Sequence, residues 1–170
     1  MTATRAVVIG IGTGCRRDDG VGPEVASRIA VLRIPGVRVA ISDGECTGLL
    51  DLWTGSDLAV VVDAVIGTPS RPGRVRRVDG QCLRGSSAVT SSHALGVAEA
   101  VRLGEVLGRL PGRLVIFAVD VERHDLGIGL SAPVAAAVPR LTAAICGELE
   151  QYTRGRRRTA RSYPSLGGPS

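Results

Sequence analysis

Short runs of aliphatic and largely β-branched residues constrain the fold of this chain more than any other feature of its sequence. The runs at 5–11 and 58–63 are almost continuously apolar, as in strands that are buried on both faces of a parallel sheet. Two more strands are predicted at 37–42 and 114–121. Segments with helical spacing of apolar residues or with helix-starting residues alternate with these strands, at 23–32, 47–53, 91–107 and 131–152.

The alternation of strands and helices indicates an α/β protein with a mainly parallel sheet between helical layers. Residues 74–79 differ, because valines alternate there with arginines, and this pattern predicts an edge strand with one face in water. Thr47 is expected to cap the second helix. Pro139 is expected to divide the last helical region into a short helix and a longer one that reaches Tyr152.

The length of the chain, 170 residues, allows one domain with a substantial core and not two. The sequence has one Trp, two Tyr and one Phe, so the core must be aliphatic and the stacking surfaces of single-stranded nucleic-acid binders are missing. The formal charge of +5 equals the five arginines found from residue 154 onward, where no acid occurs. Residues 1–153 are therefore neutral overall and are predicted to form the domain, followed by a disordered Arg-rich tail at 154–170. We expect no nucleic-acid partner.

The sequence shows neither a leader peptide nor an apolar run close to the ~18 residues of a membrane span, so we expect a cytoplasmic protein with no membrane partner. The four cysteines form no C-x-x-C pair, which argues against a zinc ribbon or a thioredoxin-type site. A disulfide framework is not expected in a domain with an aliphatic core.

Acidic residues follow three of the predicted strands. Asp18 and Asp19 come after the first strand, Asp43 after the second, and Asp63 ends the third. His93 lies at the start of the helix that follows the edge strand. Ligands of open parallel sheets bind beyond the carboxyl ends of the strands, near the point where the strand order reverses. Two carboxylates and an imidazole that meet there would form a metal site suited to nickel or zinc more than to magnesium.

Each of these residues also has a purely structural interpretation. Asp18 or Asp19 could cap the helix that follows, and the Asp-Gly pair at 43–44 is common in turns. His93 could equally be a capping residue. The argument for function is stronger at Asp63, because an acid that closes a run of three valines is rarely there for packing.

Two further residues have weaker claims to a function. Cys15 lies in the loop of the candidate site, but the sequence identifies no neighbouring group that would activate it as a nucleophile. His124 lies in the charged stretch 122–125 and is expected at the surface. No G-x-S-x-G elbow, H-E-x-x-H helix or G-K-[ST] phosphate loop is present.

The glycines at 10–14 also invite comparison with a dinucleotide-binding loop. Two observations argue against that alternative, a nucleotide-dependent oxidoreductase. The third glycine of G-x-G-x-x-G is replaced by Cys15. Asp18 and Asp19 would also place two negative charges at the helix end that should receive a pyrophosphate.

Five motifs, in order and with compatible spacing, resemble those of the hydrogenase-maturation endopeptidases. The resemblance covers roughly residues 5–150. The motifs are Val7–Gly12 with Asp18–Gly22, Asp43–Gly44 with Gly48–Leu50, Val60–Ala64 with Pro72–Gly73, Ser91–Gly96 with Glu99–Ala100, and Gly127–Ser131.

The resemblance implies a five-stranded, three-layer α/β/α fold, in which we expect the edge strand at 74–79 to run antiparallel. It implies a peptidase that removes a C-terminal peptide from the large-subunit precursor of a NiFe-hydrogenase after nickel has been inserted. The metal ligands would be Asp19, Asp63 and His93, and the catalytic acids Asp19, Asp43 and Asp63. The nickel would arrive with the substrate, zinc or another divalent metal could occupy the site at rest, and the protein is expected to be a monomer.

Two departures from the family pattern fall near the presumed substrate cleft. Thr13 stands where the family often has Asn, and the segment 43–46 reads Asp-Gly-Glu-Cys where the family usually has Asp-Gly-Gly-Thr. A second alternative therefore stays open: a metal chaperone or docking factor of hydrogenase assembly that uses the same residues without cleaving its partner.

Overall fold

The computed structural model describes residues 5–13, 17–84, 92–122 and 127–161, and the side chains within these ranges except those of 92–95 and 159–161. The strands and helices alternate almost throughout, with two short 3-10 turns, η1 and η2. In chain order the elements are β1 (Ala6–Ile11), η1 (Arg17–Gly20), α1 (Val21–Val31), β2 (Val37–Ser42), α2 (Cys46–Trp53), β3 (Leu58–Ile66), β4 (Val75–Asp79), η2 (Gly80–Leu83), α3 (Ser92–Leu107), β5 (Arg113–Val121) and α4 (Ala132–Arg161).

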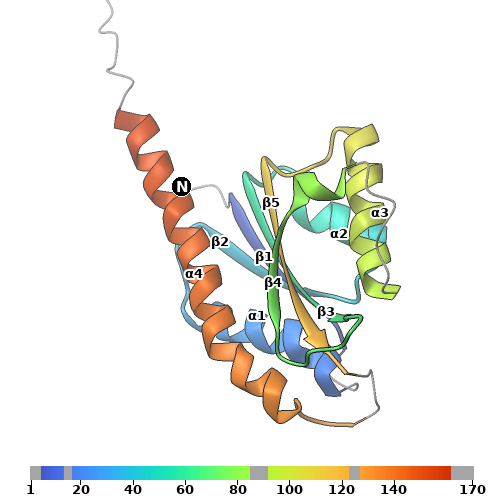
Figure 1. The fold of residues 1–170 in the computed structure, drawn as a ribbon. Helices are drawn as coiled ribbons and strands as arrows, with labels where there is room; N and C mark the ends of the chain where they lie inside the picture. Colours follow the sequence, from blue (N-terminus) through green and yellow to red (C-terminus); the bar gives the residue numbers. More distant parts are fainter. Residues whose placement is uncertain (1–4, 14–16, 85–91, 123–126, 162–170) are drawn as a thin grey trace, which may run out of the picture.

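The sheet has the strand order β2-β1-β3-β5-β4. β1, β2, β3 and β5 are parallel to their neighbours, whereas the edge strand β4 runs antiparallel to β5. Helices α1 and α4 cover one face of the sheet, and α2 and α3 cover the other (Figure 1). The predicted three-layer α/β/α fold with an antiparallel edge strand is confirmed. Because the chain goes from β1 outward to β2 and then returns to β3 on the other side, the strand order reverses between β1 and β3.

Successive residues of the central strands enter two separate cores. Val8 and Val60 pack towards α1 and α4, whereas their neighbours Val7 and Val61 pack towards α2 and α3. Trp53, the one tryptophan of the sequence, is fully buried in the second core. Burial of each such side chain is worth about 1.5–3 kcal/mol, so strands that are apolar on both sides hold the two helical layers to the sheet.

Two glycines bring α1 into backbone contact with the carboxyl ends of the strands. A Cβ atom on Gly22 would overlap the carbonyl oxygen of Ile11 and lie 2.8 Å from that of Val62. A Cβ atom on Gly10 would overlap the carbonyl oxygen of Gly22. Any side chain at these positions would push the start of α1, and the turn that precedes it, away from β1 and β3.

Pro139 does not divide the last helical region, contrary to the prediction. α4 is one helix of 30 residues with Pro139 inside it. Pro139 and Ala135, whose carbonyl loses its helical partner, are both exposed, so water can take that hydrogen bond. Val138 and Leu141, on either side of the proline, are buried against the sheet and hold both halves of the helix in line.

The same helix continues beyond the predicted end at Tyr152. Residues 154–161 form its last turns, so the disorder predicted for this stretch is not found, while residues 162–170 lie outside the described part of the chain. Arg156 Nη1 lies 2.9 Å from the hydroxyl of Tyr152 and 2.9 Å from Asp57 Oδ2, and these contacts tie the extension to the domain. Figure 1 shows the last turns of α4 reaching past the sheet.

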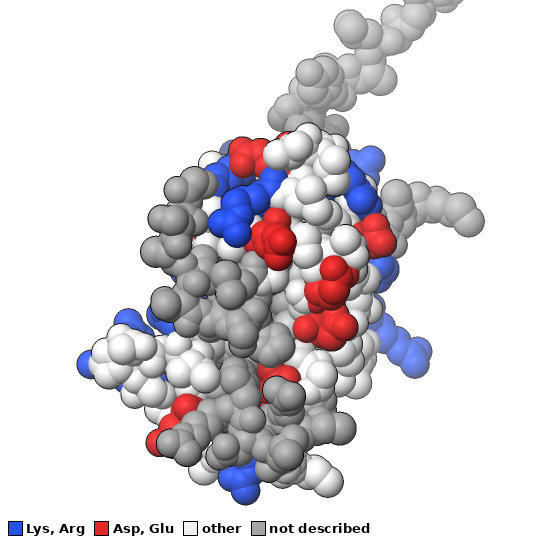
Figure 2. Space-filling model, turned by 90° about the vertical axis from the view of Figure 1, so that its right-hand side faces the viewer, with Lys and Arg blue, Asp and Glu red and all other residues white. Residues whose placement is uncertain are grey.

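On the side of α3, the described arginines and acids form small, mixed groups (Figure 2). Among the described helices, none is long and apolar enough to cross a lipid bilayer.

Candidate functional site

Asp63 occupies the first position on β3 that has no partner on β1. The pairing of β1 with β3 ends at Gly10 and Val62, while β3 continues to Ile66 along β5. The prediction that Asp63 ends its strand is therefore wrong by three residues. The acid nevertheless stands at the reversal of strand order, where an open sheet leaves room for a ligand.

The turn after β1 delivers Asp19 to the same place. Gly12 has a φ of 141°, and a Cβ atom there would overlap the carbonyl oxygen of Asp19, so only glycine lets the loop fold back this closely. Asp19 Oδ2 accepts hydrogen bonds from the backbone N–H of Thr13 at 2.9 Å and from its hydroxyl at 3.1 Å. The Asp19 carboxylate is 1% exposed and held in a fixed orientation.

The two buried acids repel each other. Burial, and then the charge of Asp19, raise the pKa of Asp63 to about 7, although a hydrogen bond from the backbone of Ala64 opposes the shift. Asp63 Oδ1 is buried and accepts no hydrogen bond from a described residue. Such a pair is stable near neutral pH only if a proton or a cation reduces its charge. The arrangement suits a divalent metal ion that would bind Asp63 Oδ1.

Asp18 has a different role, although it is the neighbour of Asp19. Both of its oxygens are used by Ser131, whose backbone N–H donates to Oδ1 at 2.6 Å and whose hydroxyl donates to Oδ2 at 2.8 Å. The backbone N–H of Arg17 also donates to the carbonyl of Gly127 at 3.0 Å. These bonds fasten η1 to the start of α4. Asp18 is thus a structural acid, but it does not cap the helix that follows it, as the structural interpretation had it, because no side chain caps α1.

Asp43 is exposed at the end of β2, and its Oδ1 accepts a hydrogen bond from the backbone of Glu45 at 3.0 Å. Glu45, and not the predicted Thr47, caps α2: its Oε2 accepts from the backbone of Gly48 at 3.0 Å and from the hydroxyl of Thr47 at 2.5 Å. The departure from the family pattern at residue 45 therefore supplies a helix cap. Asp43 forms the turn before it and remains open to solvent.

His93 lies in the first turn of α3, which starts at this edge of the sheet (Figure 1). Three residues further on, Gly96 lies so close to the backbone of Gly44 that a Cβ atom would overlap its carbonyl oxygen. This contact sets the start of α3 beside the turn that contains Asp43. The side chain of His93 is not among those described, and the side chains that are described include no group of three or more His, Cys, Asp or Glu that could hold a metal ion. The trio with Asp19 and Asp63 stays a prediction.

The structure gives less support to a function for the remaining candidates from the sequence. Cys15 and His124 lie outside the described residues. Three of the cysteines are free thiols, of which Cys82 is exposed and Cys46 and Cys146 are half-buried. Burial is the main cause that raises the pKa of the Cys46 and Cys146 thiols, so neither is prepared to act as a thiolate nucleophile.

The candidates from the sequence do not include every buried acid. Asp120 lies near the carboxyl end of β5 and is 2% exposed. It pairs with Arg76 on β4, whose Nη2 is 2.7 Å from Asp120 Oδ1. The sequence pattern that points to Asp63, an acid near the end of an apolar strand, is also present in residues 114–121.

These observations define an α/β protein with a buried acidic site where the strand order of its sheet reverses. Residues 35–148, more than half of the chain, match the family model of the hydrogenase maturation proteases. The chain belongs to this family and is therefore a peptidase.

Two characterised relatives match most of the chain. The sequence is 26% identical to the Hydrogenase 2 maturation protease of Escherichia coli (strain K12) over 137 residues, which cover 79% of this chain and 84% of the relative. It is 28% identical to the hydrogenase expression/formation protein HupD of Rhodobacter capsulatus over 153 residues, 87% of this chain and 72% of the relative.

Solved structures with the same fold include two maturation proteases. The hydrogenase maturating endopeptidase HybD from Escherichia coli has a TM-score of 0.72 at 21% identity and covers 87% of this chain and 93% of its own. The [NiFe] hydrogenase maturation protease HybD from Thermococcus kodakarensis has a TM-score of 0.65 at 22% identity, with coverage of 85% and 98%. Both likenesses confirm the fold.

Proposed function

We propose that this protein is the endopeptidase that removes a C-terminal peptide from the nickel-loaded large-subunit precursor of a NiFe-hydrogenase. The observation that carries the proposal is the buried pair of Asp19 and Asp63 at the reversal point of the sheet, in a chain of the maturation protease family. The precursor is thus the partner, and the protease acts on it as a cytoplasmic monomer.

The nickel ion belongs to the substrate. Asp63 Oδ1, which has no partner among the described residues, is the oxygen best placed to bind it. Asp19 is oriented by Thr13 and would supply a second carboxylate, and His93 on α3 an imidazole. The bound nickel would polarise the scissile carbonyl as a Lewis acid. Zinc or another divalent ion can take the same ligands when substrate is absent.

The residues of the chain then orient the peptide and handle protons. A carboxylate beside the bound nickel can take up a proton from the attacking water through its other oxygen, and this is the role we assign to Asp63. Asp43 is exposed beside the start of α3, and we assign it contact with the peptide near the cleavage position.

The test is incubation of the purified protein with nickel-loaded and with nickel-free precursor, followed by measurement of intact masses. We expect one cut near the C-terminus of the nickel-loaded precursor and almost none in the nickel-free form, even when free nickel or zinc is added. His93→Ala should strongly slow the single cut. Efficient cleavage of the nickel-free precursor, or of unrelated unfolded proteins, would refute substrate-borne nickel as the trigger.

A further inference from the structure

Asp120 holds an arginine in one position at the same edge of the sheet as the acidic pair. Arg76 Nη2 lies 2.7 Å and Arg76 Nε lies 3.2 Å from Asp120 Oδ1, so two nitrogens of the guanidinium are fixed by one carboxylate oxygen. Asp120 is almost fully buried, whereas 45% of the Arg76 side chain is exposed. The acid is thus enclosed, and part of the guanidinium it holds faces solvent.

The loop between β3 and β4 encloses the acid. A Cβ atom on Gly67 would lie 2.9 Å from Asp120 Oδ2. The backbone of Asp120 accepts a hydrogen bond from Gly73 at 2.8 Å and donates one to Arg74 at 2.8 Å. These two bonds fix the backbone of Asp120 on both sides of its Cα atom. Its carboxylate therefore cannot follow Arg76 if the arginine moves.

The strand register places Arg76 in the same row as Asp63. Asp63 pairs with Ala118 of β5, and Ala118 pairs with Arg76 of β4, so the two residues are two strand spacings apart, about 10 Å. Both belong to the sheet face covered by α2 and α3, because Val61 and Val78, two residues away on each strand, pack into that core. A ligand seated over Asp63 and extending across β5 would reach the guanidinium.

The surroundings of Arg76 are basic. Arg71 and Arg74, on the loop before β4, are exposed, and neither forms an ion pair with any residue in the described part of the chain. The edge of the sheet therefore has a negative centre at Asp19 and Asp63 and a positive rim beside it. A substrate that matches both would present a cation and, at a distance of about 10 Å, an anion.

We propose that Arg76, fixed by Asp120, is a substrate-binding residue that takes a carboxylate of the precursor. This inference rests on the proposed function. The planar guanidinium matches a carboxylate through two parallel hydrogen bonds, and fixing it beforehand lowers the entropy lost on binding. An extended peptide advances about 3.3 Å per residue, so the carboxylate lies roughly three residues from the scissile bond. Asp120 acts through Arg76 and is a positioning residue.

A purely structural ion pair would resemble the one formed by the next residue of β4. Arg77 faces the opposite side of the sheet, where its Nε lies 2.5 Å from the buried Glu148 of α4. It has the same residue type, the same strand and a buried acidic partner, but it is remote from the acidic pair. Arg77→Gln is therefore a matched control for Arg76→Gln.

The experiment measures kcat and KM for nickel-loaded precursor with the wild-type protein, Arg76→Gln, Arg76→Lys, Asp120→Asn and Arg77→Gln, with thermal melting as the check of folding. We expect Arg76→Gln to raise KM by about tenfold to a hundredfold with little change in kcat, since a charge-assisted hydrogen bond is lost. Arg76→Lys should recover part of the loss and Asp120→Asn should show part of it. Arg77→Gln should lower the melting temperature and leave KM unchanged.

A second set of experiments, with altered precursors, identifies the carboxylate that Arg76 binds. Precursor in which the acids near the scissile bond are changed to amides should lose affinity for the wild-type protein but show no further loss with Arg76→Gln. If only amidation of the precursor's C-terminus has this effect, the terminal carboxylate is the ligand. An unchanged KM in a folded Arg76→Gln protein, or an equal rise in Arg77→Gln, would overturn the inference.

Failure of the proposed function is distinguishable, because binding of nickel-loaded precursor can be followed by calorimetry without cleavage. If the wild-type protein binds the precursor and does not cut it, the proposed function fails, and weaker binding by Arg76→Gln alone would still support the inference. If Arg76→Gln binds as tightly as the wild-type protein, the inference fails whether or not cleavage occurs.

Discussion

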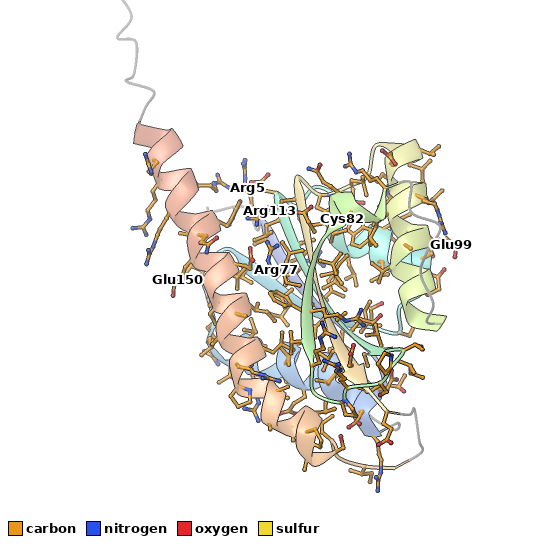
Figure 3. The ribbon with its side chains drawn as sticks, viewed as in Figure 1. Arg5, Arg77, Cys82, Glu99, Arg113 and Glu150 are labelled. Atoms are coloured by element: carbon orange, nitrogen blue, oxygen red, sulfur yellow. The ribbon has the colours of Figure 1, made fainter. Side chains whose placement is uncertain are left out.

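Buried acids occur in two regions of this molecule, and the two regions treat them in opposite ways. On the side of α4, the Glu148 carboxylate lies 2.5 Å from Arg77 Nε and 3.3 Å from Arg113 Nη2, so each oxygen has a cation beside it. Figure 3 shows Arg77 and Arg113 between α4 and the strands. At the reversal point of the sheet, Asp63 has another acid as its neighbour and one oxygen without a described partner.

The different surroundings of Glu148 and Asp63 indicate which acid stabilises the fold and which one serves function. Glu148 serves the fold and is paired with two arginines, because a lone buried charge costs several kcal/mol. An acid kept beside another acid lowers the stability of the fold, and such arrangements persist where a proton or a metal ion is to be bound. Asp18 and Asp19 repeat the contrast one residue apart, since Ser131 satisfies both oxygens of Asp18.

The largest effect should come from Asp63→Asn. The variant should fold, lose most of its affinity for nickel or zinc, and cut the nickel-loaded precursor on the order of a thousandfold more slowly. Calorimetry and intact-mass kinetics measure the two losses. Glu148→Ala is the control from the other region and should cut at a normal rate at a temperature where it is folded. Undiminished metal binding by a folded Asp63→Asn protein would remove Asp63 from the site.

Removal of the paired acid should show its effect in stability. Glu148→Ala removes the buried charge and leaves Arg77 and Arg113, which are partly exposed, without their shared partner, so we expect a loss of about 1–2 kcal/mol in the free energy of unfolding. Glu150→Ala on the same helix removes only the exposed pair with Arg154 and should cost less than about 0.5 kcal/mol. Urea denaturation measures both, and equal losses in the two variants would contradict the distinction.

The metal-free protein should lose stability as the pH rises, because the pKa of Asp63 is raised from 3.8 to about 7 on folding. A group with a raised pKa contributes stability that is fully present below the unfolded value and is lost as the pH rises through the folded value. In the presence of a chelator, Asp63→Asn should be more stable than the wild-type protein by up to about 4 kcal/mol at pH 8, and the difference should shrink towards pH 4. A difference that does not depend on pH would show that the pKa of Asp63 is not raised in the folded protein.

The smallest effect concerns the end of α4. A chain that stops at Thr153 loses the contacts of Arg156 with Asp57 and Tyr152, groups that are largely exposed. We expect the melting temperature to stay within a few degrees of that of the full chain and the rate of cleavage to be unchanged. The hydrogen bond from Tyr152, the main cause of the lowered pKa of Asp57, remains in this variant. If truncation stopped cleavage without unfolding, residues 154–170 would have to contact the precursor.

The sequence predicted the strands and the positions of the two site acids because both depend on local patterns. Continuous aliphatic runs identify β1 and β3, and an acid within or just after such a run is visible without any structure. The register of the sheet is not visible in this way, so the sequence could not show that Asp63 lies beside the end of β1 while its own strand continues to Ile66.

The errors arose where tertiary contacts override local preference. Pro139 disfavours a helix, but Val138 and Leu141 pack on the sheet and keep α4 continuous. Arg156 lies in a stretch with the composition of a disordered tail, yet Asp57, far away in the sequence, holds it. Asp120 has the same local pattern as Asp63, but the pattern does not show that Arg76 on the edge strand pairs with it.

The contact of Gly10 and Gly22 makes the acidic pair sensitive to mutations at positions outside the pair. Every missense change of a glycine codon adds at least a Cβ atom, and at either position that atom has no free volume to enter. The spacing of Asp19 and Asp63 thus depends on two glycine codons as well as on the codons of the acids themselves. A survey of random variants selected for cleavage should find these two glycines as intolerant of substitution as the carboxylates themselves.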